Sequence, residues 1–251
     1  GVIHENGSDG TVRVSTANLN ASYMKLVFNE SSNEVKVQEQ ESCYDPIAFG
    51  VIYNKNHGTI VRPDKDDSSF LGLIAESLDI ENPDDYQQHI AQLIKMSDET
   101  FERGMADKER EKKYHQYQHL VTRVHDQFGE KVEDYFLEFF QEDNDDQDSV
   151  IAKIQSEILE KVKAYSKDAS YRSFLFDITD MKKEILDKGM RVDMSLCAAA
   201  LSKDISYYNA KEHLTVVSTK AKTLLKPNTT LFVDIELPRI QADRVFKFTK
   251  K

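Results

Sequence analysis

The feature that most constrains the fold of this chain is a change of hydrophobic period near residue 112. Residues 82–111 repeat apolar side chains at intervals of three, four and seven, which is typical of an amphipathic helix. Later segments, such as residues 231–237, alternate apolar and polar side chains, which is typical of half-buried strands. The change predicts two regions of different architecture, residues 1–112 and residues 113–251.

The helical segment before the change is expected to begin at Asn82. Asn is a favoured N-cap residue, and Pro83 suits the first helical position. Asp84 and Asp85 then stabilise the positive end of the helix dipole. Residues 99–111 mix both charge signs densely, which indicates a solvated helix end.

The second region is expected to be rich in strands. Strands are predicted within residues 119–140, 173–178, 190–196 and 231–237. Residues 127–130 are predicted to form a hairpin turn. Helices are predicted at residues 149–165 and from Asp180 to Gly189, a residue type that suits a helix C-terminus. Together these elements predict a β-sandwich with helical insertions.

Two loops in the first 70 residues carry residue types of a catalytic site. A short apolar run at residues 2–4 leads into a glycine-rich loop with Asp9. A continuous apolar run at residues 47–53, typical of a buried strand, leads into a loop with His57. In α/β-hydrolases the nucleophile, the acid and the histidine follow one another along the chain, on loops after strands. Asp9 and His57 fit the last two positions, although each also fits a plain turn or loop residue.

The residues around these two loops resemble a known family. Residues 8–14 with 17–20, and residues 49–61, resemble the loops that carry the triad acid and the triad histidine in bacterial esterases and lipases. These are serine α/β-hydrolases with an appended C-terminal β-rich domain, and they include or lie close to the cell-associated bacterial phospholipases A. The resemblance extends to residues 123–129, 134–140 and 226–230.

The resemblance implies both a fold and an activity. Residues 1–112 would be the C-terminal part of an α/β-hydrolase catalytic domain, and residues 113–251 a β-sandwich-like accessory domain, which gives an α/β plus β fold class. Asp9 would be the triad acid and His57 the triad base in the hydrolysis of a carboxylic ester, with lipid esters as one substrate class. The implied mechanism passes through an acyl-enzyme and needs no metal or organic cofactor.

The third member of such a triad is missing from the sequence. No G-x-S-x-G motif occurs in the 251 residues. Ser8 and Ser15 lie beside the predicted acid, and Ser195 lies within an alternating strand, so none fits a strand–turn–helix elbow. Because the chain opens at Gly1 beside an apolar run, we expect a C-terminal portion of a longer protein, with the nucleophile upstream and no efficient catalysis by this portion alone.

The resemblance also implies what this chain would bind. One partner would be the missing N-terminal half of the hydrolase domain, and the substrate would be an ester or a lipid. A half-sheet would expose an edge and apolar faces, so self-association into a homo-oligomer is a further prediction. The resemblance favours the bacterial cytoplasm or a membrane surface as the location.

Composition argues against several other classes of protein. The net charge of −11 argues against nonspecific nucleic-acid binding, which needs cations to neutralise phosphates. Cys43 and Cys197 make neither a disulfide framework nor a zinc site, and no apolar run approaches the roughly 18 residues of a membrane span. His115 and His119 are spaced for a helical metal site, but their region is predicted to be strand, and no metal is expected.

Three alternatives remain open on sequence alone. The chain also fits a noncatalytic β-sandwich module that binds a lipid surface or a partner protein. Residues 23–37 are expected to form a hairpin, which suits either a lid over the site or a plain structural element. The acidic run at residues 142–148 fits either a calcium loop or, by default, a solvated loop.

Overall fold

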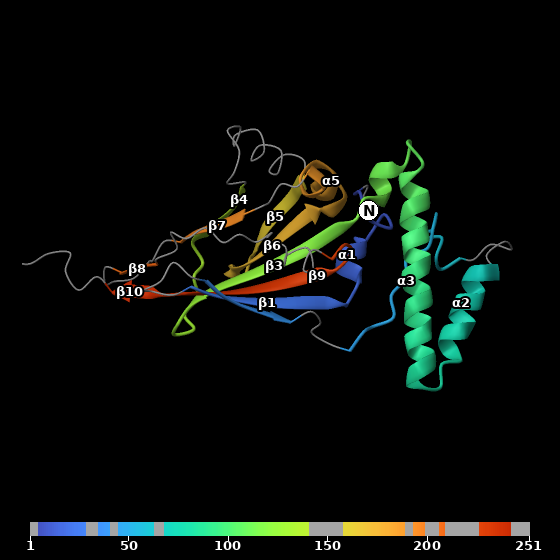
Figure 1. The fold of residues 1–251 in the computed structure, drawn as a ribbon, viewed down its shortest axis with the longest axis horizontal. Helices are drawn as coiled ribbons and strands as arrows, with labels where there is room; N and C mark the ends of the chain where they lie inside the picture. The colour runs from blue at the N-terminus through green and yellow to red at the C-terminus, as the bar shows by residue number, and fades with distance from the viewer. Residues whose placement is uncertain are drawn as a thin grey trace, which may run out of the picture.

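The computed structural model describes residues 5–28, 35–40, 45–62, 68–140, 158–188, 193–198, 206–208 and 226–241. Their largest element is a six-stranded sheet whose strands run along the long axis of the view in Figure 1. Two helices, α2 (Ser68–Leu78) and α3 (Pro83–Met105), stand at one end of the sheet (Figure 1).

The main sheet mixes parallel and antiparallel strands. In order across the sheet they are β2 (Val35–Gln40), β1 (Ala21–Phe28), β9 (Thr230–Leu237), β3 (Tyr117–Asp126), β6 (Asp168–Asp177) and β5 (Leu159–Tyr165). Strand β9 lies parallel to both β1 and β3, and the other pairs are antiparallel. Two smaller sheets pair β4 (Tyr135–Phe140) with β7 (Asp193–Ala198), and β8 (Ser206–Tyr208) with β10 (Arg239–Gln241).

The hydrophobic core lies against the centre of the main sheet. Leu26 of β1 and Val124 of β3 are both in register with Ile235 of β9, and all three side chains are almost completely buried. The period-2 alternation of these strands places every second side chain on the core face. Among the described residues, this central row therefore joins the first strand, β1, to the last long strand, β9.

The predicted hairpin at residues 23–37 forms from β1 and β2. Phe28 lies opposite Val35 in the antiparallel register, and residues 29–34 lie outside the described residues. Met24, Leu26 and Phe28 are all buried in the core. Burial of three apolar side chains supports the plain structural element over the lid, because a lid has to leave its site to admit a substrate.

The remaining helical elements of the described residues are short. They are α1 (Val14–Ala17), η1 (Glu111–Tyr114), α5 (Ile178–Glu184) and η3 (Leu186–Lys188). The helix predicted after Asp180 forms slightly earlier, because Asp177 is the N-cap and accepts from the Asp180 backbone at 3.0 Å. Among the described residues, no helix is both long and apolar enough to cross a bilayer.

The predicted sandwich is not confirmed. Strands β1 and β2 precede residue 112, yet they share one mixed sheet with four strands that follow it. Alternation reveals that a segment is a strand, but not which strand lies beside it, and β1 and β9 are separated by most of the chain. The division of the chain into two domains at residue 112 stays a prediction, with β1 and β2 contributing to a sheet that lies across it.

The prediction of a helix at residues 149–165 is wrong for residues 159–165. Residues 159–165 form strand β5, paired antiparallel with β6, and residues 149–157 lie outside the described residues. Val162 and Tyr165 fit a helical spacing, but both are exposed on β5. Backbone pairing with β6 therefore decides the conformation, and no apolar helix face is buried here.

The predicted turn at residues 127–130 forms, but its hairpin is short. The Asp126 carboxylate accepts from the backbone N–H groups of Phe128 and Glu130, and Gly129 has a φ of 82°. The returning chain pairs with β3 only at a single bridge, His125 with Lys131. Strand β4 then pairs with β7, because both long edges of β3 are already occupied by β6 and β9.

Candidate active site

Residues 5–13, which we call the acid loop, are held by hydrogen bonds within the loop. Ser8 and Arg13 face each other in an antiparallel bridge, and Gly7 and Gly10 have positive φ angles of 63° and 89°. The Asp9 Oδ1 atom accepts from the backbone N–H groups of Thr11 at 2.9 Å and Val12 at 2.7 Å. One carboxylate oxygen of Asp9 therefore closes the turn.

The second carboxylate oxygen of Asp9 faces His57. Asp9 Oδ2 accepts from His57 Nδ1 at 2.9 Å, and the His57 backbone N–H donates to the Asp9 carbonyl at 2.9 Å. The structure thus brings together the two residues predicted from the sequence as acid and base. Their catalytic role stays a prediction.

The loop that carries His57 is built by Asn56. Its side-chain oxygen accepts from the backbone N–H groups of Gly58 and Thr59, both at 2.9 Å, and Ile60 N–H donates to its carbonyl at 2.9 Å. Asn is suited to such turns because its side chain copies a backbone acceptor. The His57 side chain is 60% exposed, so it is available to a solute rather than packed as a core histidine.

The environment of Asp9 favours its charged form. Partial burial acts to raise the pKa of the Asp9 carboxyl. Hydrogen bonds from Val12, His57 and Thr11 act in the opposite direction and outweigh burial, so the pKa lies below its ordinary value. An ionised Asp9 can hold the proton of the His57 ring on Nδ1, which leaves Nε2 as the basic nitrogen.

The apolar run at residues 47–53 is not a strand in the described structure. Its backbone instead bonds to side chains of α3: the Tyr86 hydroxyl accepts from Ala48 N–H at 3.0 Å, and Ser97 Oγ from Val51 N–H at 2.9 Å. Thr100 Oγ1 donates to the Val51 carbonyl at 2.9 Å. The prediction of a buried strand is wrong, because polar side chains of α3 form the hydrogen bonds that a neighbouring strand would supply.

Other candidate residues lie apart from this pair or carry other contacts. Ser8 Oγ donates to the Glu5 carbonyl at 2.8 Å, and Ser15 is buried in α1. The side chain of Ser195, the segment 2–4 and the acidic run 142–148 lie outside the described residues.

The two histidines considered for a metal site have separate surroundings. His119 hydrogen-bonds Ser173 at 2.9 Å and Thr230 at 3.2 Å, and burial lowers its pKa. His115 Nδ1 lies 2.6 Å from Asp177 Oδ2 and 3.9 Å from Asp180 Oδ2, so three potential ligand atoms gather within 4.8 Å. Sequence spacing could not reveal this cluster, because His115 lies just before β3, whereas Asp177 ends β6 and Asp180 lies in α5, far along the chain.

Comparisons with known proteins match the fold and not the sequence. No family model and no curated protein sequence matches this chain. Among solved structures, phospholipase PlaB from Legionella pneumophila matches with a TM-score of 0.76 and 19% identity, covering 98% of this chain and 54% of that chain. The same phospholipase in complex with thio-NAD matches with a TM-score of 0.75 and 20% identity, covering 98% and 56%. The chain therefore spans about half the length of these structures and shares a phospholipase-like fold with that half.

Proposed function

We propose that this chain is the C-terminal portion of a serine carboxylic-ester hydrolase and supplies the triad acid Asp9 and the triad base His57. The observation that carries the proposal is the 2.9 Å contact between Asp9 Oδ2 and His57 Nδ1, with the imidazole exposed. The likeness of the fold to half of a phospholipase supports the same reaction class. It also makes a lipid ester the first substrate to test.

The proposed chemistry needs one residue from outside the chain. A serine hydroxyl, supplied by an upstream segment, loses its proton to His57 Nε2 as its oxygen attacks the ester carbonyl carbon. Asp9 stabilises the imidazolium that forms, and does not take the proton itself. His57 then gives the proton to the leaving alcohol, which produces an acyl-enzyme. Water, activated by His57 in the same way, releases the carboxylic acid and restores the serine.

The test uses substitutions in the full-length protein. On a short-chain ester and on phospholipid micelles, we expect Asp9→Asn to lower kcat by about 10⁴-fold and His57→Ala by about 10⁶-fold, as loss of the triad acid and of the triad base does in serine hydrolases. Asp9→Asn keeps an oxygen that can close the acid loop, so its effect reports the lost charge and not a lost turn.

A matched control is Asp107→Asn. Asp107 Oδ1 accepts from the Glu109 backbone at 3.1 Å, so this residue closes a turn much as Asp9 does, and its side chain is similarly exposed. Turnover should be unchanged in this variant. If Asp9→Asn and His57→Ala also keep normal turnover, the triad assignment is refuted and the noncatalytic binding module is favoured.

A further inference from the structure

We propose that Arg13 is a positioning residue, which ties the acid loop to the six-stranded sheet and thereby sets the orientation of Asp9 against His57. The inference rests on the proposed function, since it concerns the same Asp9–His57 pair. In this proposal Arg13 does not touch a substrate, and it acts on the pair through the backbone of the acid loop.

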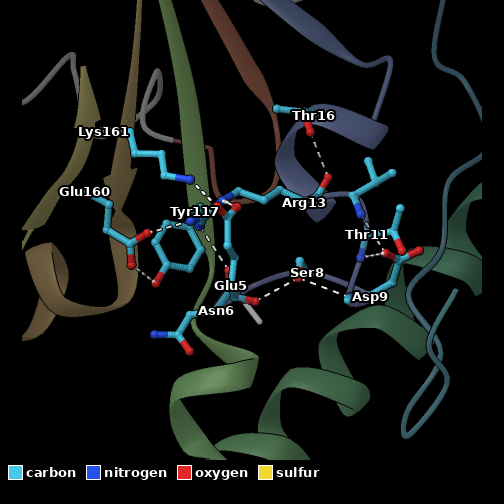
Figure 2. A network of polar contacts seen from close by, with 12 residues as sticks. Glu5, Asn6, Ser8, Asp9, Thr11, Arg13, Thr16, Tyr117, Glu160 and Lys161 are labelled. Carbon is cyan, nitrogen blue, oxygen red and sulfur yellow. Dashed lines mark hydrogen bonds and ion pairs between the residues drawn. The ribbon is translucent and has the colours of Figure 1, made fainter. Parts of the chain in front are cut away.

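The guanidinium of Arg13 is bonded on three sides (Figure 2). Its Nε donates to Glu5 Oε2 at 3.0 Å, its Nη1 to the Asn6 carbonyl at 3.0 Å, and its Nη2 to Glu160 Oε2 at 2.7 Å. It also lies over the Tyr117 ring, 4.9 Å from the centroid. Arg13 is only 8% exposed, so solvent does little to weaken these contacts.

Glu160 and Tyr117 anchor this network to the main sheet. Glu160 belongs to β5 and Tyr117 to β3, and the Tyr117 hydroxyl donates to Glu160 Oε1 at 2.6 Å. Burial and the Glu160 carboxylate raise the pKa of Tyr117, so the hydroxyl stays a donor. Lys161 of β5 pairs with Glu5 of the acid loop. The two carboxylates and two cations thus balance one another between sheet and loop.

The backbone of the acid loop also rests directly on Tyr117. A Cβ atom on Gly7 would lie 2.3 Å from Tyr117 Cδ2, which only glycine avoids, and Gly7 has a φ of 63°. The Gly7 N–H donates to the Lys113 carbonyl at 3.2 Å, and its carbonyl accepts from Val14 at 3.0 Å. The loop therefore cannot shift along the sheet without disturbing Arg13 or Tyr117.

Arg13 reaches Asp9 through both ends of the loop. Its side chain holds residues 5 and 6 at the start, and its backbone pairs with Ser8 in the bridge that encloses Asp9. Asp9 and Val12, the residue before Arg13, exchange two hydrogen bonds, at 2.7 and 3.1 Å. A tilt of the loop would move Asp9 Oδ2 relative to His57 Nδ1, and displacements of this kind cost catalysis far more than binding.

The experiment compares Arg13→Met, Arg13→Lys and Glu160→Gln in the full-length protein. We expect Arg13→Met to lower kcat by about 10- to 100-fold, the effect of a misplaced catalytic group, with KM nearly unchanged. Arg13→Lys keeps the charge but cannot bond three separate acceptors in a plane, so it should recover only part of the rate. Glu160→Gln, which keeps the shape and loses the charge, should lie between wild type and Arg13→Met.

The split between kcat and KM separates positioning from a merely structural role. A misplaced Asp9–His57 pair slows the chemical step in protein that is folded, and substrate binding is retained. The kcat per folded molecule should therefore fall in Arg13→Met and recover in part in Arg13→Lys, with KM close to wild type in both, once the folded fraction is measured by circular dichroism. A variant that only unfolds more easily would lose folded protein without lowering the kcat per folded molecule.

Arg172→Met is the matched control. Arg172 lies on β6, where it stacks 3.9 Å from the Tyr135 ring centroid and donates to the Glu133 carbonyl. This variant should lower the unfolding midpoint but leave KM and the kcat per folded molecule unchanged.

If Arg13→Met and Glu160→Gln keep the wild-type kcat per folded molecule while Asp9→Asn and His57→Ala lose activity, the role of Arg13 is refuted and the proposed function stands. If Arg13→Met does not fold, Arg13→Lys and Glu160→Gln decide by the same criterion. Full activity in His57→Ala would instead overturn the proposed function itself.

Discussion

At the residue scale, the two oxygens of the Asp9 carboxylate have different partners. Oδ1 closes the acid loop by accepting from two backbone N–H groups, and Oδ2 faces His57. On sequence alone, a turn residue and a triad acid are competing interpretations of Asp9. The geometry is compatible with both at once, because a carboxylate has enough lone pairs for a turn and a side-chain partner.

The buried pair His115 and Asp177 makes stability depend on pH. The hydrogen bond that His115 donates to the Asp177 carboxylate raises the pKa of His115 above 6.5 against the opposing effect of burial, and the charges of Asp177, Asp180 and Glu111 add to the rise. A raised folded-state pKa means that the stabilisation is complete below the unfolded pKa of about 6.5 and is lost as the pH rises through the folded value.

Denaturation by urea at a series of pH values checks this prediction. The free energy of unfolding should contain a component that falls as the pH rises above about 6.5, the ordinary histidine value. Asp177→Asn should remove that component, while Asn can still cap α5 in place of the aspartate. A wild-type stability that does not change across this range, or an unchanged slope in Asp177→Asn, would contradict the assignment.

At the element scale, α3 forms where its sequence signals place it. Asn82 is the N-cap and accepts from the Asp85 backbone N–H at 3.0 Å, and Pro83 opens the helix. This was predictable because a cap and its partner lie three residues apart. The run at residues 47–53 was not predictable, because the groups that satisfy its backbone lie on α3, far along the chain.

The N-cap of α3 gives a prediction at this scale. Asn82→Ala should lower the free energy of unfolding by about 1 kcal/mol, the usual cost of losing a side-chain cap. Asn82→Ser keeps a capping oxygen and should recover most of the loss. Chemical denaturation of the three proteins is the measurement. Equal stability of Asn82→Ala and wild type would show that the cap contributes nothing here.

At the scale of the whole molecule, β9 links strands that lie far apart in the sequence. It lies parallel between β1 and β3, and Ile235 is in register with Leu26 on one side and Val124 on the other. Ile235 is completely buried. A cavity at this position therefore affects strands on both sides of residue 112.

Ile235→Ala tests this connection. The substitution should lower the free energy of unfolding by about 2–5 kcal/mol, the range for large-to-small changes in a core. Amide hydrogen exchange should show β1 and β3 losing protection together. Val162→Thr on the exposed edge strand β5 is the control and should change stability by less than about 0.5 kcal/mol. Retained protection in β1 alone would mean that the strands before residue 112 unfold as a separate unit.

The sequence by itself determined features that depend on near neighbours along the chain. It predicted α3 and its cap, the existence of β3, β4, β6, β7 and β9, and the pairing of Asp9 with His57 as a hypothesis drawn from two loop motifs. Only the tertiary structure decided the order of the strands and the strand conformation of residues 159–165, for which the sequence pattern predicts a helix. It also decided the contacts of Arg13 with Glu160 and of His115 with Asp177. The physical reason is that caps, turns and hydrophobic periodicity depend on interactions between residues that are close in the sequence. Strand partners and buried ion pairs depend instead on which residues, distant in the sequence, can be buried against one another in the folded protein.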